Sequence, residues 1–308
     1  MRQLRRQEHR GRDEDTISPP REKPRLWFSG LPEKVSLPPD FYYPNYMETV
    51  TSMDGTKIAF EKQGDGPALI IVLGALADHT MAAVPQLAEM LAQDFTVYNY
   101  DRRGKGQSGD TLPYAVEREI EDLEALIDTA GGGAYVYGHS SGAALALLAA
   151  AGPGSRIRKL ALYETPYNDD PHARARWKGY IAQLTRLLAD GRKGDAIALF
   201  LQYMGTPAEQ VEGMRHAPFW QTMEAASHTL AYDHTAILGN EAAVPVNIAA
   251  RVKIPTLVMA GGMSFPFMRK TAETLRSIMP HAKMRILEGQ THEVSPAALA
   301  PVLREFFR

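Results

Sequence analysis

The chain has 308 residues, a formal net charge of −2 and no cysteine; 44% of its residues are hydrophobic and 23% are charged. The length allows one large domain or one domain with an inserted subdomain, and the composition is typical of a globular protein. The charge gives no case for binding nucleic acid or an anionic membrane, and without cysteine there are no disulfides, thiolate nucleophiles or cysteine metal sites. The chain contains neither a run of roughly 20 apolar residues nor the apolar core of a signal peptide, so we expect a cytoplasmic protein.

The first 45 residues are polar, rich in arginine and repeatedly interrupted by proline. This composition predicts a flexible N-terminal extension over residues 1–45, because such a segment cannot bury enough apolar surface to fold. A basic arm that binds a partner is the alternative.

Strand and helix patterns alternate through most of the remaining chain. A β-hairpin is expected first, with Asp54-Gly55 between its two strands. Short apolar runs predict buried strands at 68–73, 95–100, 134–138, 158–163, 256–260 and 284–288, and amphipathic periods predict helices at 78–93, 116–130, 267–279 and 296–308. This alternation indicates an α/β protein with a doubly wound, mostly parallel sheet, formed by residues 46–165 and 251–308.

Residues 166–250 break the alternation. They contain no convincing strand, and helical patterns recur at 172–188, 195–204, 207–214 and 219–238. We refer to residues 166–250 as the inserted segment, and we expect it to form a helical cap (lid) over the carboxyl edge of the sheet. Ligands bind at that edge in open α/β folds.

The stretch Gly138-His139-Ser140-Ser141-Gly142 lies between a predicted strand and a predicted helix of small residues. Gly-x-Ser-x-Gly in this context is a nucleophile elbow, a sharp turn that raises the serine and leaves no room for side chains two positions away. Free N–H groups at the start of the helix would face the reaction centre. A glycine-rich turn with an ordinary capping serine is the alternative, and a packed core position is expected for His139.

From about residue 47 onward the chain resembles the α/β-hydrolase superfamily, in the elbow, the strand order and the order serine, acid, histidine. This resemblance places the histidine in the loop after the last strand, where Gly289-Gln290-Thr291-His292 stands. His292 is therefore the candidate general base for Ser140, and a loop-packing histidine is the alternative. His281 is expected to be exposed.

The position of the acidic residue that would pair with the histidine departs from the commonest pattern of the superfamily. No carboxylate occurs in Gly261–Met268, where most members carry an aspartate, whereas Glu164 ends the strand that follows the elbow. Burying such a charge without a partner is unfavourable, so Glu164 is the candidate acid; Asp233 is the weaker alternative, and a structural salt bridge is a third role for Glu164. Haloalkane dehalogenases and zearalenone lactonases include members with the acid at this place. The lactonases resemble this chain more closely, through Ser140-Ser141-Gly142-Ala143, Arg156-Ile157-Arg158 and Glu164-Thr165-Pro166.

An oxyanion hole needs two backbone N–H donors. The candidates are Ser141, which follows the nucleophile, and Ala75, in the loop after strand 68–73. The glycine-rich stretch 102–108 is expected to form a structural turn in which Asp101 and Arg102 hydrogen-bond nearby loops. It matches Gly-x-Gly-x-x-Gly by letters only, since no helix begins there, and no cofactor or metal is expected.

Aromatic residues and methionines are frequent in the inserted segment, which suggests an apolar or aromatic substrate, although most such residues form helix cores. The candidate substrate-binding residues are Leu76, Trp220, Met223, Tyr232, His234 and Phe265. The sequence thus predicts a serine hydrolase that cleaves a small-molecule ester or lactone. Thioester cleavage, acyl transfer, C–C bond hydrolysis and a non-catalytic binding protein are alternatives, and a homodimer is left open.

Overall fold

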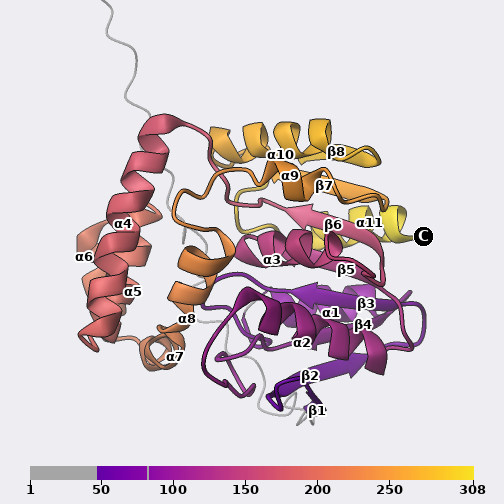
Figure 1. Cartoon of the computed structure of the whole chain (residues 1–308), viewed down its shortest axis with the longest axis horizontal. Helices are drawn as coiled ribbons and strands as arrows, with labels where there is room; N and C mark the ends of the chain where they lie inside the picture. The colour runs from indigo at the N-terminus through magenta and orange to yellow at the C-terminus, as the bar shows by residue number, and fades with distance from the viewer. Residues whose placement is uncertain (1–46, 82) are drawn as a thin grey trace, which may run out of the picture.

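The computed structural model describes residues 47–81 and 83–308, and the predicted N-terminal extension lies outside these residues. Its centre is an eight-stranded sheet in the order β1-β2-β4-β3-β5-β6-β7-β8 (Figure 1). The strands are β1 Glu48–Thr51, β2 Lys57–Gln63, β3 Ala68–Val72, β4 Thr96–Tyr100, β5 Ala134–His139, β6 Ile157–Tyr163, β7 Thr256–Gly261 and β8 Ala282–Leu287. The hairpin β1–β2 is antiparallel and β2 pairs antiparallel with β4, while β4, β3, β5, β6, β7 and β8 run parallel to one another. The predicted strands and their mostly parallel arrangement are confirmed.

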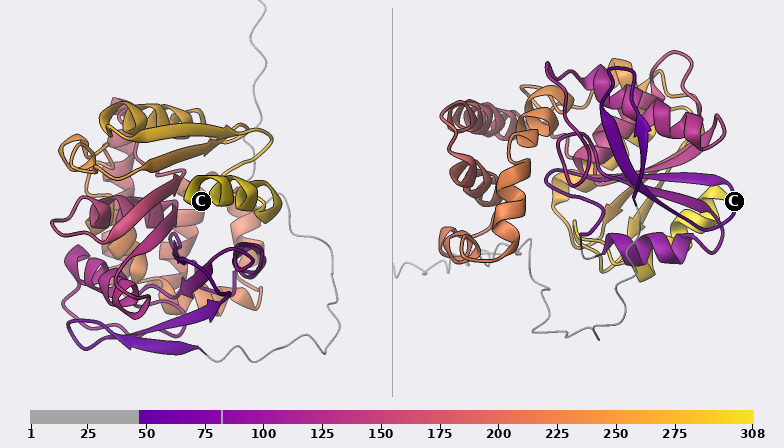
Figure 2. Two further views of the ribbon diagram at one scale, coloured as in Figure 1. Left: turned by 90° about the vertical axis from the view of Figure 1, so that its right-hand side faces the viewer. Right: turned by 90° about the horizontal axis from the view of Figure 1, so that it is seen from below.

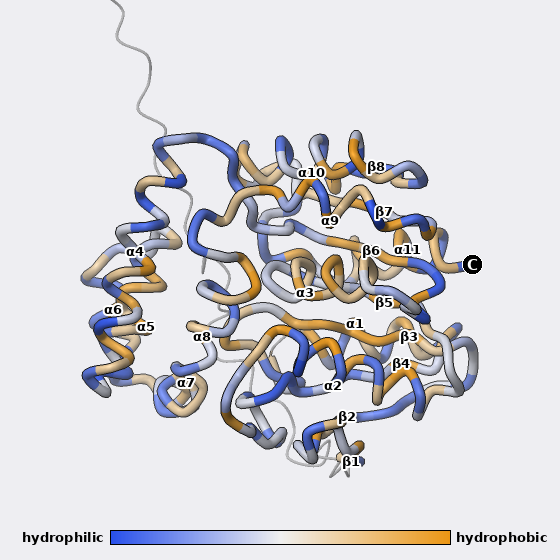
Figure 3. The backbone as a smooth tube through the Cα atoms, viewed as in Figure 1, coloured by the Kyte–Doolittle hydropathy of each residue, from blue (hydrophilic) through white to orange (hydrophobic). Residues whose placement is uncertain are grey.

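Alternate side chains of the strands pack into two apolar layers, as expected for a sheet that is buried on both faces. Ile70 and Val72 of β3 pack with helices α2 (Val116–Thr129), α3 (Ser141–Ala150) and α10 (Pro266–Ile278). Leu69 and Ile71 pack on the other face with α1 (Val84–Leu91) and α11 (Pro296–Phe307). Helix α3 is apolar on all sides because it lies between the sheet and its neighbouring helices (Figure 3). This packing holds the carboxyl ends of β3, β5 and β6 at one edge.

The inserted segment is helical, as predicted, and stands beside that edge of the sheet (Figure 2). Its elements are α4 Pro171–Ala189, α5 Lys193–Tyr203, α6 Ala208–Met214, α7 Phe219–Ala226, α8 Thr229–Ala231, the π-helix η1 Tyr232–Ile237 and α9 Val246–Ala249. None of the helices in the described part of the chain has the length and apolar character needed to cross a membrane.

Two predicted helices differ in the structure. The helix expected at 78–93 is reduced to α1, because Asp78 accepts hydrogen bonds from the backbone and hydroxyl of Thr80 and holds a turn there, while Pro85 lies at the start of α1. The helix expected at 219–238 is divided into α7, α8 and η1. The wider π-helical turn brings Asp233 onto a buried cluster of charges, which periodicity in the sequence does not reveal.

Candidate active site

Ser140 lies in a sharp turn between β5 and α3 with φ 57° and ψ −128°, a left-handed conformation that non-glycine residues rarely adopt. A Cβ atom at Gly138 would lie 2.6 Å from the Cα of Ala143, and one at Gly142 would overlap the carbonyl oxygens of Val72 and Leu73. The close backbone approach therefore requires glycine at both positions. The strand, turn and helix predicted around Ser140 are present.

Two further non-glycine residues at this edge have positive φ: Leu76 at 57° and Glu164 at 51°. Leu76, Ser140 and Glu164 follow β3, β5 and β6, which are neighbours in the sheet. Strained backbone of this kind persists only where the surrounding structure enforces it, and it concentrates at functional sites. Its concentration here marks the carboxyl edge of the sheet as the candidate site.

His292 and Glu164 are in direct contact. The Nδ1 of His292 lies 2.7 Å from Glu164 Oε2, which also accepts a hydrogen bond of 2.8 Å from the hydroxyl of Ser264. Glu164 Oε1 accepts from the N–H of Gly261 at 2.8 Å, and Glu164 is only 1% exposed. Burial alone would raise the pKa of Glu164, but the charge and hydrogen bond of His292 together with these donors hold it below its ordinary value. Ser264 lies in Gly261–Met268, the stretch whose sequence contains no carboxylate. Its hydroxyl supports Glu164, and a search of that stretch for acidic residues alone does not find it.

Backbone contacts bring this pair next to Ser140. The N–H of Ser140 donates to the carbonyl of Tyr163, the residue before Glu164, at 3.0 Å. On the other side, the Nε2 of His139 donates to the carbonyl of His292 at 3.0 Å, and the two rings lie 4.8 Å apart. Burial and the neighbouring His292 lower the pKa of His139 to about 4, so its ring is neutral at pH 7. The structure thus brings Ser140, Glu164 and His292 together at one edge, and packs His139 against His292 and Tyr163.

The loop Gly74–Ala77 after β3 faces the same place. Its turn is closed by a 3.4 Å hydrogen bond from the N–H of Ala77 to the carbonyl of Gly74, with the left-handed Leu76 at the third position. Ala75, Ser140 and Ser141 line one cavity. Ser141 is the first residue of α3, and the first N–H groups of a helix have no acceptor within it. Two backbone N–H groups predicted as oxyanion donors therefore belong to residues that border the cavity at Ser140.

The cavity has a volume of about 640 Å³ and extends from Ser140 into the inserted segment. Aromatic side chains form much of its wall, namely Trp177, Tyr180, Phe200, Tyr203, Phe265 and Phe267. His234 also lines it, and its Nδ1 lies 2.8 Å from the hydroxyl of Tyr180. Burial lowers the pKa of His234 to about 4, which keeps this ring neutral at pH 7. Of the candidate substrate-binding residues, His234 and Phe265 border this cavity.

The other four candidates lie elsewhere. Trp220 is buried in an apolar cluster among α5, α6 and α7, and Met223 packs against that cluster. Tyr232 stacks on Tyr114, with ring centroids 3.7 Å apart, and donates to a carboxylate oxygen of Asp110. Leu76 packs against two apolar clusters, one on the sheet and the other among α5, α6 and α7. For Trp220, Met223 and Tyr232 the sequence could not separate packing from substrate contact, because helical periodicity identifies an apolar face without showing whether that face meets a neighbouring helix or a cavity.

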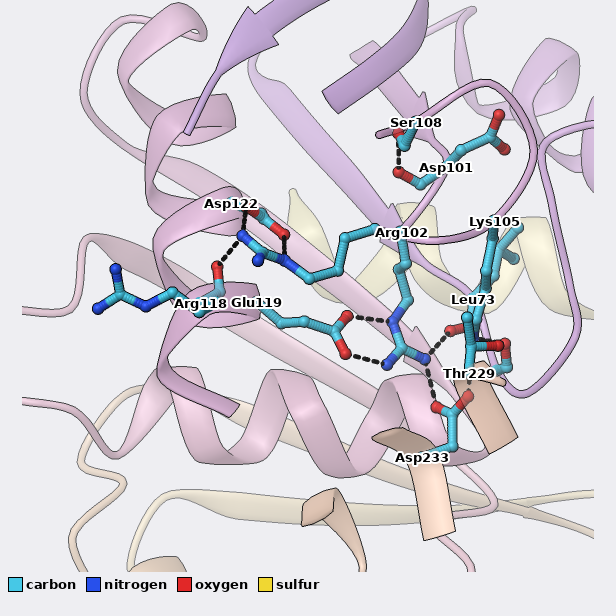
Figure 4. Close-up of polar contacts among 12 residues, drawn as sticks. Leu73, Asp101, Arg102, Lys105, Ser108, Arg118, Glu119, Asp122, Thr229 and Asp233 are labelled. Carbon is cyan, nitrogen blue, oxygen red and sulfur yellow. Dashed lines mark hydrogen bonds and ion pairs between the residues drawn. The ribbon is translucent and has the colours of Figure 1, made fainter. Parts of the chain in front are cut away.

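Next to the site lies a buried group of charges that we call the charged cluster: Arg102, Lys105, Glu119 and Asp233 (Figure 4). Arg102 binds Glu119 through two hydrogen bonds of 2.7 and 2.8 Å, and it donates to Asp233 at 2.6 Å. Lys105 donates to the other oxygen of Asp233 at 2.8 Å. Burial would raise the pKa of Asp233, but these two cations hold it well below its ordinary range. Asp233, the alternative acid, is thus engaged by Arg102 and Lys105, whereas Nδ1 of His292 contacts Glu164.

The turn predicted after β4 also has the contacts expected of it. Asp101 accepts hydrogen bonds from the N–H groups of His79 and Gln107, and Arg102 donates to the carbonyl of Leu73.

Asp78, His79 and Asp101 bring potential metal-ligand atoms within 4.8 Å of one another. The Nδ1 of His79 contacts both carboxylate oxygens of Asp101 at 2.9 Å, so these three atoms bind one another instead of pointing at a shared metal position.

Known proteins share this architecture. Residues 69–302 match the model of the alpha/beta hydrolase family. The crystal structure of an alpha/beta hydrolase from Sphaerobacter thermophilus is 51% identical, with a TM-score of 0.74, covering 85% of this chain and all of that one. A thermophilic esterase from Thermogutta terrifontis shares the fold at 22% identity and a TM-score of 0.62, over 85% of this chain and 98% of its own.

An uncharacterized hydrolase from Bacillus subtilis, YraK, is 34% identical over 97 residues, which are 30% of this chain and 35% of that protein. The chain thus matches only about a third of the length of this relative. The match to the family covers most of the described sheet and the inserted segment between its strands. The chain therefore belongs to the alpha/beta hydrolase family.

Proposed function

We propose that the protein is a serine hydrolase that cleaves a carboxylic ester or lactone through Ser140, His292 and Glu164. The observation that carries the proposal is the 2.7 Å contact between Nδ1 of His292 and the buried Glu164, beside a serine held in a strained turn. A buried carboxylate that orients a histidine next to an activated serine is the arrangement that acyl-transfer chemistry requires.

In this mechanism the Oγ of Ser140 attacks the substrate carbonyl, and the Nε2 of His292 accepts the proton that the serine loses. Glu164 fixes the Nδ1–H tautomer of His292 and stabilises the imidazolium ion. The N–H groups of Ser141 and Ala75 donate to the oxyanion. His292 then protonates the leaving oxygen, and a water molecule activated by the same histidine cleaves the acyl-enzyme to release the acid and free Ser140.

The inserted segment would act as the cap of this site and select the substrate. The aromatic wall of the 640 Å³ cavity favours an apolar or aromatic substrate. When the hydroxyl of Tyr180 donates to Nδ1 of the neutral His234, the remaining ring proton is on Nε2, which can donate to a substrate oxygen. The resemblance to zearalenone lactonases makes aromatic and macrocyclic lactones the first compounds to assay after simple esters.

The test is labelling with a fluorophosphonate, with the modified residue located by peptide mapping and turnover of p-nitrophenyl acetate and butyrate measured in parallel. We expect one label, on Ser140, and loss of both label and turnover in Ser140→Ala. Ser277→Ala is the control, because its hydroxyl lies on an exposed turn of α10 and bonds only within that helix. Wild-type protein without label and without turnover of esters or lactones would contradict the proposal.

A further inference from the structure

Two members of the charged cluster contact the loop that carries Ala75. Lys105 donates to the carbonyl of Gly74 at 3.0 Å, and Arg102 donates to the carbonyl of Leu73 at 3.2 Å. Both cations are buried, with Lys105 only 2% exposed. Neither contact is needed to neutralise charge, because Asp233 and Glu119 already pair with these two side chains. The cations therefore also determine the orientation of two consecutive peptide groups in the loop.

The geometry of a peptide bond gives the Lys105 contact a consequence at the cavity. The carbonyl of Gly74 and the N–H of Ala75 belong to one planar trans peptide group, in which they point in opposite directions. A carbonyl held toward buried Lys105 directs the N–H of Ala75 away from the cluster. The loop lies against the nucleophile there, since a Cβ atom at Gly74 would be 3.0 Å from the Cβ of Ser140, and Ala75 itself lines the cavity.

A cation on the carbonyl also strengthens the N–H as a donor. Hydrogen bonds in a chain polarise one another, and a charged partner in a buried site polarises the peptide more than a neutral one. The N–H of Ala75 would therefore carry more positive character than an ordinary amide. This effect acts on the developing oxyanion and leaves the neutral ground-state carbonyl little changed.

Asp233 links this arrangement to the inserted segment. It is fully buried on η1 and holds Lys105 with one carboxylate oxygen and Arg102 with the other. The position of Lys105 therefore depends on η1 being packed in place.

We propose that Lys105 is a positioning residue of the oxyanion hole, which orients and polarises the Gly74–Ala75 peptide, and that Asp233 of the inserted segment holds Lys105 there. This inference rests on the proposed function, because it requires Ala75 to be an oxyanion donor. It assigns a role in turnover to a buried lysine that neither accepts a proton from the nucleophile nor contacts the triad acid.

The first test compares Lys105→Met with Arg103→Met on p-nitrophenyl butyrate. Arg103 is the matched control, because it is an equally buried cation that pairs with Asp122 and Asp54 and has no contact with the Gly74–Ala77 loop. Removing an oxyanion donor lowers kcat by about 10²- to 10³-fold, so misorienting one should lower it by about 10- to 100-fold. We expect this loss in Lys105→Met with KM changed less than about twofold, and kcat within about threefold of wild type in Arg103→Met.

The second readout is binding of an aryl trifluoromethyl ketone, whose carbonyl carbon bonds to Oγ of Ser140 while its oxygen becomes an oxyanion. Its inhibition constant should rise in Lys105→Met by the same factor by which kcat falls, and remain near the wild-type value in Arg103→Met. Thermal unfolding followed by circular dichroism reports the stability of both variants. A purely structural role for Lys105 would lower stability in both and leave the ketone affinity of the folded protein unchanged.

Because the chain has no cysteine, Lys105→Cys has a single thiol. Alkylation with 2-bromoethylamine in denaturant, followed by refolding, installs a thioether analogue of lysine, and wild type treated in the same way is the control. We expect the alkylated protein to recover most of the kcat that Lys105→Cys lacks. If Lys105→Met does not fold, Lys105→Gln is assayed by the same criteria.

The outcomes separate the two proposals. An active wild type with kcat unchanged in Lys105→Met, equal losses in both methionine variants, or no recovery after alkylation would overturn the positioning role alone. A wild type that neither takes the fluorophosphonate nor hydrolyses esters would overturn the proposed function and this inference with it.

Discussion

Two buried carboxylates lie near the carboxyl edge of the sheet, and their partners differ. Glu164 accepts hydrogen bonds from a histidine, a hydroxyl and a backbone N–H, none of which is a permanent charge. Asp233 accepts from Arg102, which keeps its charge at any physiological pH, and from Lys105, whose pKa is lowered by burial and by the charge of Arg102. Both groups are at most 1% exposed, so burial alone does not distinguish them.

The comparison shows what each arrangement can do. A carboxylate with a titratable partner can stabilise a positive charge that appears only during a reaction, which suits a histidine that gains and loses a proton. A carboxylate already paired with an arginine and a lysine gains little when a proton moves nearby, and it serves instead to hold several elements together. Glu164 therefore has the surroundings of a triad acid, and Asp233 has those of a structural anchor.

The largest expected change in kcat tests the role of Glu164 as the triad acid. Glu164→Gln should reduce kcat by about 10⁴-fold, as the amide substitution does in other serine triads, because the imidazolium loses its counter-charge. Stability should change less than in a variant of Asp233, since no permanent cation loses its partner. Ester turnover and urea unfolding measure the two effects. A kcat within tenfold of wild type would show that Glu164 is only a structural salt-bridge partner.

Asp233→Asn should lower the stability of the protein more, and kcat less, than Glu164→Gln does. Removing one partner from a buried ion pair leaves uncompensated charge, so we expect a loss of about 3–5 kcal/mol in the free energy of unfolding. The folded fraction should lose no more than the roughly 10- to 100-fold in kcat expected for Lys105→Met, since Lys105 loses its partner while Ser140, His292 and Glu164 retain their contacts. Urea unfolding and active-site titration separate the two quantities. A loss of activity as large as that of Glu164→Gln would remove the distinction between the two carboxylates.

Acid should weaken both regions, since each contains a histidine whose pKa lies at about 4: His139 beside His292, and His234 beside Asp233. An unfolded histidine binds a proton below about pH 6.5, so stability falls as pH drops from 6.5 toward 4, by up to about 3 kcal/mol for the buried His234. Urea midpoints across this range should show less pH dependence in His234→Gln than in wild type. An unchanged slope would mean that His234 does not resist protonation.

His79 should act in the opposite direction. Its hydrogen bond to Asp101 raises its pKa, so the stability that it contributes is present below pH 6.5 and is lost as the pH rises through the folded value. The loss of this contribution occurs above pH 6.5 and does not obscure the acid range.

The smallest expected effect tests the hydrogen bond from Ser264 to Glu164. Ser264→Ala removes one of the donors to Oε2 of Glu164, which should raise the pKa of that carboxyl and lower stability by about 1 kcal/mol. The catalytic effect should stay below about tenfold, since the contact with His292 remains. A pH–rate profile and urea unfolding check both. A loss of kcat comparable with that of Glu164→Gln would show that the catalytic role of Glu164 depends mainly on the hydroxyl of Ser264 and not on the contact with His292.

Much of the sheet and the placement of Ser140 and Glu164 follow from local sequence. Buried strands are continuous apolar runs, and residues that directly follow neighbouring parallel strands meet at one edge, so Ser140, Glu164 and Ala75 could be placed without a structure. His292 needed the resemblance to known hydrolases, because a loop histidine has no periodic signal of its own.

Other features depend on distances that local patterns do not encode. The contact between Lys105 and Asp233 joins residues 128 positions apart and requires the π-helical turn η1. Trp177 lines the cavity whereas Trp220 does not, although both occupy apolar faces of helices. Which face meets a cavity is decided by how the helices pack, and that arrangement emerges only at the tertiary level.

The left-handed backbone at Leu76, Ser140 and Glu164 has a consequence for engineering. Each such residue lowers stability by about 1–3 kcal/mol relative to a relaxed backbone, and glycine would relieve the strain at all three positions. Selection of variants for thermal stability alone would therefore favour glycine wherever the side chain contributes less stability than this strain removes, and these residues are the ones proposed to shape the oxyanion loop, to attack the substrate and to support proton transfer. A directed-evolution campaign that seeks a more heat-resistant catalyst should keep these three codons fixed and look for its gains elsewhere in the chain.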